Sequence, residues 1–166
     1  MKDKYTNKLS IAYHEAGHAV ITWALGVPLH HIKVGDFEGK VIGGTAAEYF
    51  YDADTMSDFD WSKIKNKALI LLSGREAERA YHELHELEFD ELLSSHYDRN
   101  ELADLLKKFG ESNSPPIDMS TKTLGKQAYD LVTRHWDQIE VLAKKLMING
   151  SMKGDEAKRI IESGEL

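Results

Sequence analysis

The stretch "IAYHEAGHAV", residues 11–20, constrains this chain more than any other, because it sets three polar side chains in an apolar, helix-periodic background. His14 and His18 are four apart, with Glu15 directly after the first histidine. Residues at this spacing lie on one helix face, with Cβ atoms about 5–6 Å apart. Buried polar groups need partners, since leaving them unpaired is costly. The segment therefore predicts a helix over residues 8–25 that holds a ligand on one face.

Two imidazoles at this spacing can bind one zinc ion at about 2.0–2.1 Å each, and H-E-x-x-H on a helix is typical of metallopeptidases. Glu15 is offset by one residue from His14, so it would lie beside the metal rather than on it. There it would act as a general base on zinc-activated water and later pass the proton to the leaving amine. A short pattern of this kind also arises by chance, so an ordinary helix carrying two histidines is the alternative.

A catalytic zinc site needs a third protein ligand and an open position. The chain has no cysteine, so this ligand must be a histidine, an aspartate or a glutamate. Asp98, His96 and Glu78 all stand in or near predicted helices. Spacing alone does not choose among these three residues.

The other histidines favour structural roles. His82 and His85 are three apart in "YHELHELE", a charge-rich stretch typical of an exposed helix end. His30 and His31 are adjacent in a predicted strand, so their side chains face opposite ways. We expect His135 to pack within a later helix rather than to bind metal.

Length and charge narrow the class of protein. The 166 residues suit one domain, spanning residues 1–166, with its own core. The formal net charge of −7 argues against a nucleic-acid surface, which needs a basic patch. No apolar run reaches the ~18 residues of a transmembrane segment, and the polar start lacks the core of a secretory signal. The expected location is the cytoplasm.

The hydrophobic pattern predicts a mainly α fold with a small β element after the first helix. Gly26 and Pro28 end that helix. Gly74 lies inside the second helix, where glycine costs about 1 kcal/mol relative to alanine, so we expect close packing there. Acidic connections are expected at 51–61 and 86–98. The predicted elements are the helix over 8–25, strands within 29–35 and 39–50, and helices over 60–87, 97–109, 120–147 and from 155.

Five segments resemble, in order, parts of the peptidase domain of the FtsH-type ATP-dependent zinc metalloproteases. The likeness covers nearly the whole chain, and its first and third segments are the more specific. In order they match the family's zinc-binding helix, its short β segment, its G-R-x-A-E helix, its aspartate segment and its C-terminal helix. They read "AYHEAGHAVITWALG", "GVPLHHIKVGDFEGKVIGGTAAEY", "LLSGREAERAY", "SSHYDRNELADLL" and "MKGDEAKRII". The resemblance implies a helical, zincin-like metallopeptidase domain.

Carried over residue by residue, the resemblance implies that His14 and His18 bind Zn²⁺ and that Glu15 is the general base. It implies that Asp98 is the third ligand. Glu78 matches an acidic position on the second long helix, from which it would orient a ligand histidine.

The strand over residues 41–48 is the expected place for substrate. An extended peptide can add to a sheet edge by backbone pairing, which tolerates many sequences. Val41 lies in this strand, and the pair Gly43 and Gly44 would permit close approach of another backbone.

The function that the resemblance implies is a zinc-dependent metalloendopeptidase acting on unfolded or flexible polypeptides. The family carries a membrane anchor and an ATPase ahead of this domain. We expect both to be absent here, and no G-x-x-x-x-G-K-[ST] loop occurs in the sequence. The family tends to have small residues before its aspartate, where this chain has His96 and Tyr97.

The expected partners are a polypeptide substrate, a separate ATPase and further copies of the chain in a homo-oligomer. One alternative is a zinc-stabilised regulatory or binding module with weak or no catalytic activity, which holds a partner protein. A metal-free helical interaction domain is the other alternative, and it predicts that a chelator changes nothing.

Overall fold

A computed structural model describes residues 4–37, 40–47, 61–89, 96–110 and 118–164. The fold is mainly helical, with a small antiparallel sheet directly after the first helix, as the sequence predicts. In chain order the elements are α1 (Lys4–Ala24), β1 (Leu29–Phe37), β2 (Lys40–Ala47), α2 (Trp61–Leu84), α3 (His96–Gly110), α4 (Thr121–Arg134), α5 (Trp136–Asn149), β3 (Ser151–Lys153) and α6 (Gly154–Ser163).

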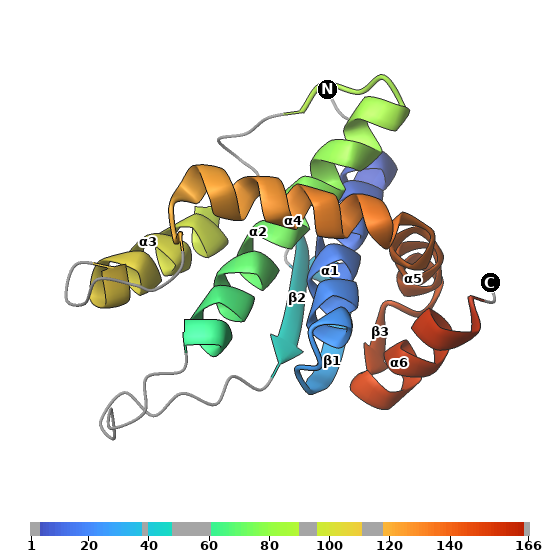
Figure 1. The fold of residues 1–166 in the computed structure, drawn as a ribbon. Helices are drawn as coiled ribbons and strands as arrows, with labels where there is room; N and C mark the ends of the chain where they lie inside the picture. Colours follow the sequence, from blue (N-terminus) through green and yellow to red (C-terminus); the bar gives the residue numbers. More distant parts are fainter. Residues whose placement is uncertain (1–3, 38–39, 48–60, 90–95, 111–117, 165–166) are drawn as a thin grey trace.

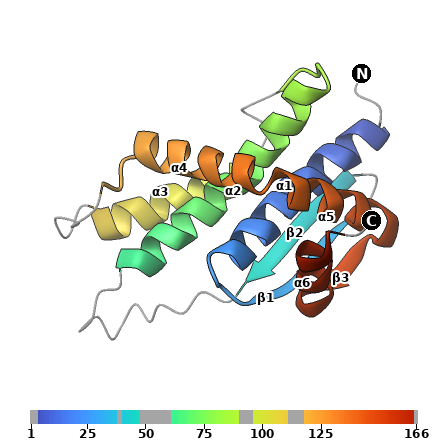
Figure 2. The same cartoon turned by 45° about the vertical axis from the view of Figure 1, so that its right-hand side comes forward.

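Helix α1 is the centre of the molecule. It lies between the sheet and α2 and also contacts α5 (Figure 1, Figure 2). Residues 12–22 are all buried, so the helix has no solvent-facing side along this stretch. Such a helix is normally apolar all round. The polar residues of the H-E-x-x-H motif must therefore find their partners inside the protein.

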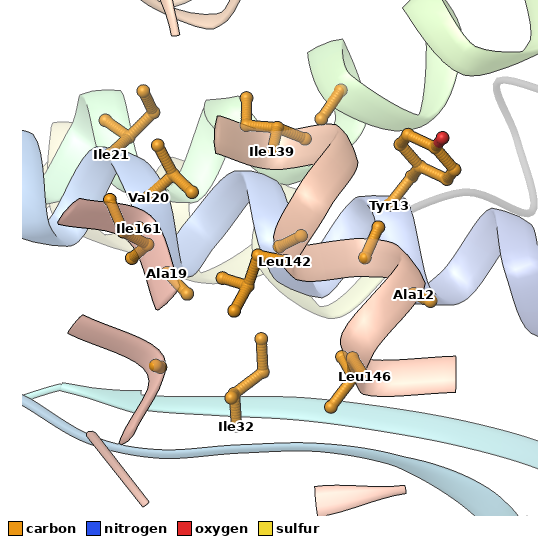
Figure 3. Close-up of a cluster of buried hydrophobic side chains, with 14 of the residues drawn as sticks. Ala12, Tyr13, Ala19, Val20, Ile21, Ile32, Ile139, Leu142, Leu146 and Ile161 are labelled. Atoms are coloured by element: carbon orange, nitrogen blue, oxygen red, sulfur yellow. The ribbon is translucent and has the colours of Figure 1, made fainter. Parts of the chain in front are cut away.

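Two hydrophobic clusters lie on either side of the α1–α2 contact. The first joins α1 to the sheet, α5 and α6, and the second joins α2 to α3 and α4. In the first, Ile32 of β1 points toward Leu142 of α5, with Ala19 of α1 nearby (Figure 3). All three side chains are fully buried. These clusters hold α1, α2 and α3 in fixed positions around the motif.

The sheet has the order β2-β1-β3, with antiparallel pairing throughout. Val34 of β1 lies opposite Gly43 of β2, and Ile32 lies opposite Met152 of β3. Within the described part of the chain, β2 pairs only with β1 and is therefore an edge strand. The short strand β3 was not predicted.

The prediction of one helix over residues 120–147 is wrong. Ser120 caps α4, but the chain turns at His135, where φ is −108° and ψ is 21°. Helix α4 packs on α2, whereas α5 packs on α1. One straight helix could not pack against both α2 and α1 in this way. At the turn, His135 packs edge-to-face against Trp23, with ring centroids 6.0 Å apart.

The other predicted elements differ from the observed ones by a few residues at their ends. The predicted acidic connections fall largely on residues 51–60 and 90–95, outside the described residues. Among the helices that the structure describes, none is both long and apolar enough to cross a lipid bilayer.

Candidate functional site

Three predicted ligand residues come together at one point. His14 and His18 project from α1, and Asp98 comes from the first turn of α3. Nε2 of His14 lies 3.0 Å from Nε2 of His18 and 3.0 Å from Oδ2 of Asp98, and the third side of this triangle is 3.2 Å. Two ligands at about 2.0 Å from a tetrahedral metal lie about 3.3 Å apart. A triangle of this size therefore suits a single zinc ion.

The far nitrogens of both histidines are fixed by hydrogen bonds. Nδ1 of His18 lies 2.7 Å from the carbonyl oxygen of Ile70, and Nδ1 of His14 lies 3.1 Å from Oε2 of Glu78. A carbonyl or a carboxylate oxygen only accepts, so both Nδ1 atoms donate. A ring without a second proton then turns a lone pair on Nε2 toward Asp98. Three acceptors this close repel one another unless a cation lies among them, so the donor set fits a metal ion.

The pKa values of the same groups also favour positive charge at this point. Burial lowers the pKa of His14, but hydrogen bonds to Asp98 and Glu78 outweigh burial and raise this pKa to about 10. Burial raises the pKa of Asp98, yet hydrogen bonds to His14 and His18 hold it well below its usual range. A proton and a metal ion would therefore compete for the centre of the triangle.

Glu15 lies on the side of α1 that faces β2, and it is buried, with 7% of its surface exposed. The hydroxyl of Thr45 donates to Oε2 of Glu15 at 2.7 Å. A Cβ atom added at Gly43 would overlap Oε1 of Glu15, so only glycine fits there. The carboxylate is thus held between α1 and the edge strand. What approaches Gly43 so closely is the Glu15 side chain rather than another backbone.

A cavity of about 450 Å³ connects the ligand triangle, Glu15 and the edge strand. Its walls include the three predicted ligand residues, Glu15, and the predicted substrate residues Gly43 and Gly44. Val41 belongs to the same strand, opposite Asp36, but its side chain lies outside the described residues. The exposed ring of Tyr97, directly before Asp98, also lines the cavity.

Of the three candidates for third ligand, Asp98 has its carboxylate at the triangle. Glu78 contacts the opposite nitrogen of His14, so it orients that ring and does not complete the triangle. His96 begins α3, and its side chain lies outside the described residues. Sequence reasoning did not single out Thr45, which holds Glu15.

The prediction of an exposed helix end is wrong for His82. His85 is exposed, but His82 has only 2% of its surface exposed. After α2 the chain reverses at Glu86, whose φ is 52°, and the Phe89 ring reaches within 5.6 Å of the His82 ring. Nδ1 of His82 lies 2.7 Å from the carbonyl oxygen of Glu88. The residues after the helix therefore cover a histidine that the charge pattern placed in solvent.

Gly74 of α2 faces the ligand triangle, which explains a glycine in mid-helix. An added Cβ atom would overlap Nε2 of His18 and lie 2.8 Å from Nε2 of His14. The rings cannot retreat without breaking the hydrogen bonds that hold their Nδ1 atoms. We therefore expect Gly74→Ala to lower the zinc content of the protein and to reduce the free energy of unfolding by about 1–3 kcal/mol. Elemental analysis and thermal unfolding would measure both effects.

Gly125 of α4 offers the matched control, because nothing lies within 4 Å of a Cβ added there. Gly125→Ala should keep full zinc and gain about 0.4–1 kcal/mol in stability. If Gly74→Ala behaved in the same way, the close approach of α2 to the histidines would be refuted.

No protein-family model matches the sequence, and no curated protein matches it significantly. The likeness to FtsH-type peptidases therefore rests on the five segments quoted above. Support for a function comes from the geometry of the site.

Proposed function

We propose that this chain is a zinc-dependent metalloendopeptidase that hydrolyses peptide bonds in unfolded or flexible polypeptides. The observation that carries the proposal is the shared cavity, into which three candidate ligands, a fixed carboxylate and an edge strand all open. A site that only stabilised the fold would need neither the carboxylate nor the open space beside the ligands.

His14, His18 and Asp98 would hold the ion, and the ion would supply acidified water and polarise a carbonyl group. Glu15 takes a proton from the attacking water and returns it to the leaving amine. The hydrogen bond from Thr45 leaves Oε1 of Glu15 for this transfer and keeps the carboxylate in one rotamer. Only 7% of the Glu15 surface is exposed, so its carboxylate contacts little bulk water.

The edge strand β2 suits an extended peptide. Its pairing with β1 uses one side of the strand, and an incoming segment would pair with the other side. Gly43 and Gly44 lie on the cavity wall, so a peptide bound there would pass close to the ligand triangle. Recognition through the backbone selects chains that are already unfolded. We extend the proposal to a separate ATPase that unfolds substrates and to assembly of the chain into a homo-oligomer.

The test is cleavage of a permanently unfolded polypeptide by the purified protein, with zinc and iron content measured on the same sample. We expect about one zinc ion per chain, cleavage that stops with a chelator, and recovery when zinc is restored. Full zinc without cleavage would overturn the peptidase and favour a zinc-stabilised binding module. A chain that takes up no metal would overturn the metal site as well.

Zinc should also stabilise the fold, because the three ligands converge only in the folded chain. At free zinc 100-fold above its dissociation constant, the free energy of unfolding should rise by about 2.7 kcal/mol. For a protein of this size we expect the thermal midpoint to rise by about 5–10 °C. A midpoint that is unaffected by zinc or chelator would contradict a site joining α1 to α3.

A further inference from the structure

Two columns of side chains face each other where α1 crosses α2. In each column the residues recur at intervals of four, the spacing that keeps side chains on one helix face. The helices run antiparallel here, because residues later in α1 meet residues earlier in α2. The columns are Ser10, His14 and His18 on α1, and Gly74, Glu78 and His82 on α2. The metal site occupies only one end of this contact.

A chain of hydrogen bonds leads from the metal ligand His14 to the far end of the columns. Oε2 of Glu78 lies 3.1 Å from Nδ1 of His14, and Oε1 of Glu78 accepts a hydrogen bond from the Ser10 hydroxyl at 2.8 Å. Ser10 Oγ lies 2.7 Å from Nε2 of His82, whose Nδ1 lies 2.7 Å from the carbonyl oxygen of Glu88. Ser10 and His82 are 4% and 2% exposed, so water does not compete for these contacts.

Both oxygens of Glu78 are held by this chain. A carboxylate oxygen only accepts, so Nδ1 of His14 donates to Oε2 and the Ser10 hydroxyl donates to Oε1. His82 lies on the other side of the Ser10 hydroxyl, and its second ring nitrogen lies against the Glu88 carbonyl oxygen. The His82 ring is therefore held at both nitrogens, and it in turn fixes the hydroxyl that holds Glu78.

We propose that Ser10 and His82 are positioning residues of the metal site, which hold Glu78 against His14 and so fix the orientation and tautomer of that ligand. Neither residue contacts the ligand triangle, and both act through Glu78. The inference rests on the metal site of the proposed function. It assigns a role to a buried histidine that packing alone does not explain, since an aromatic hydrocarbon would fit beside Tyr81 and Phe89 without needing partners.

The test measures zinc affinity by competition with a chelator in Ser10→Ala, His82→Phe and Glu78→Gln, alone and in pairs. Each single change should weaken zinc binding about 10–100-fold, the usual effect of losing an outer partner of a ligand. With Co²⁺ in place of zinc, the visible absorption bands of each variant should shift. Adding Ser10→Ala to Glu78→Gln should cause little further loss, because both changes break the same chain.

Thr22→Val is the matched control. Thr22 is a fully buried residue of the same helix, and its Oγ1 has no hydrogen-bond partner among the described residues. This variant should keep the zinc affinity and the Co²⁺ spectrum of the parent, and circular dichroism would verify the fold of all variants.

Unchanged zinc affinity in Ser10→Ala, or fully additive losses in the Ser10→Ala/Glu78→Gln pair, would overturn the positioning role while leaving the proposed peptidase intact. A parent protein that binds no zinc would overturn both. If Ser10→Ala lowers zinc affinity but the variant regains full cleavage when saturated with zinc, the positioning role is supported. That result would show that the substitution acts on zinc binding and not on the cleavage step.

Discussion

Glu15→Gln is expected to lower the rate of peptide cleavage at saturating substrate by about 10²–10⁴-fold, the usual contribution of a general base. The amide has nearly the shape of the carboxylate and still offers an oxygen to the Thr45 hydroxyl, so folding should be preserved. Glu15 is not part of the ligand triangle, so zinc content should stay at its parent value. Steady-state kinetics on an unfolded polypeptide, with zinc measured on the same sample, would test this.

Glu83→Gln provides the control for Glu15→Gln. Glu83 lies on α2 with 64% of its side chain exposed, and it should not affect cleavage. Unchanged turnover in the Glu15 variant would show that another group takes the proton. Loss of zinc together with loss of cleavage would show that Glu15 supports the metal rather than the chemistry.

Asp98→Ala is expected to remove zinc from the purified protein and to abolish cleavage. The change would leave the proposed site with two histidine ligands, and losing a direct ligand should cost more than the 10–100-fold that an outer partner contributes. The zinc-dependent rise in thermal midpoint should disappear in the same variant, because α3 is no longer joined to α1. Elemental analysis and thermal unfolding with and without zinc would measure both losses.

Asp104→Ala is the matched control for Asp98→Ala, since Asp104 is an exposed aspartate on the same helix. It should keep zinc and cleavage. If Asp98→Ala retained zinc, the third ligand would have to come from another residue, and His96 is the nearest alternative along the chain. Glu78 is a poorer alternative as third ligand, because its carboxylate contacts Nδ1 of His14 and not the Nε2 atom that faces the triangle.

The local parts of this site were predictable because helical spacing is a local property. The four-residue interval placed His14 and His18 on one face, and the offset of Glu15 placed it on the neighbouring face, where the structure has it. The glycine inside α2 correctly predicted close packing. Its neighbour, the pair of histidine rings, was not predictable, because nothing in residues 61–84 specifies what lies opposite.

The errors arose where tertiary contacts override local preference. The turn at His135 has no proline or glycine to mark it, and it exists because α4 and α5 pack on different helices. Strand β3 is three residues long and forms only by pairing with β1. His82 sits among charged residues that predict exposure, and the chain after α2 buries it.

The position of Asp98 and the Ser10–His82 contact could not be predicted from local spacing, because both depend on how separate helices pack. Spacing did not distinguish Asp98, His96 and Glu78 as third ligand, and only the resemblance favoured Asp98. The sequence does contain one signal for the Ser10–His82 contact. Ser10 precedes His14 by four residues, and His82 follows Glu78 by four, so two matching columns can be found in the sequence once α1 and α2 are paired.

The ligand triangle joins His14 to Asp98, which are 84 residues apart in the chain. An ion bound there would act as a cross-link, and by analogy with a disulfide a loop of this length lowers the conformational entropy of the unfolded chain by an equivalent of about 4.5 kcal/mol. The enclosed segment includes β2 and α2, which form part of the cavity walls. A peptidase that cuts unfolded chains would thereby be protected from its own activity while the ion stays bound, and an emptied molecule would become a substrate for a filled one.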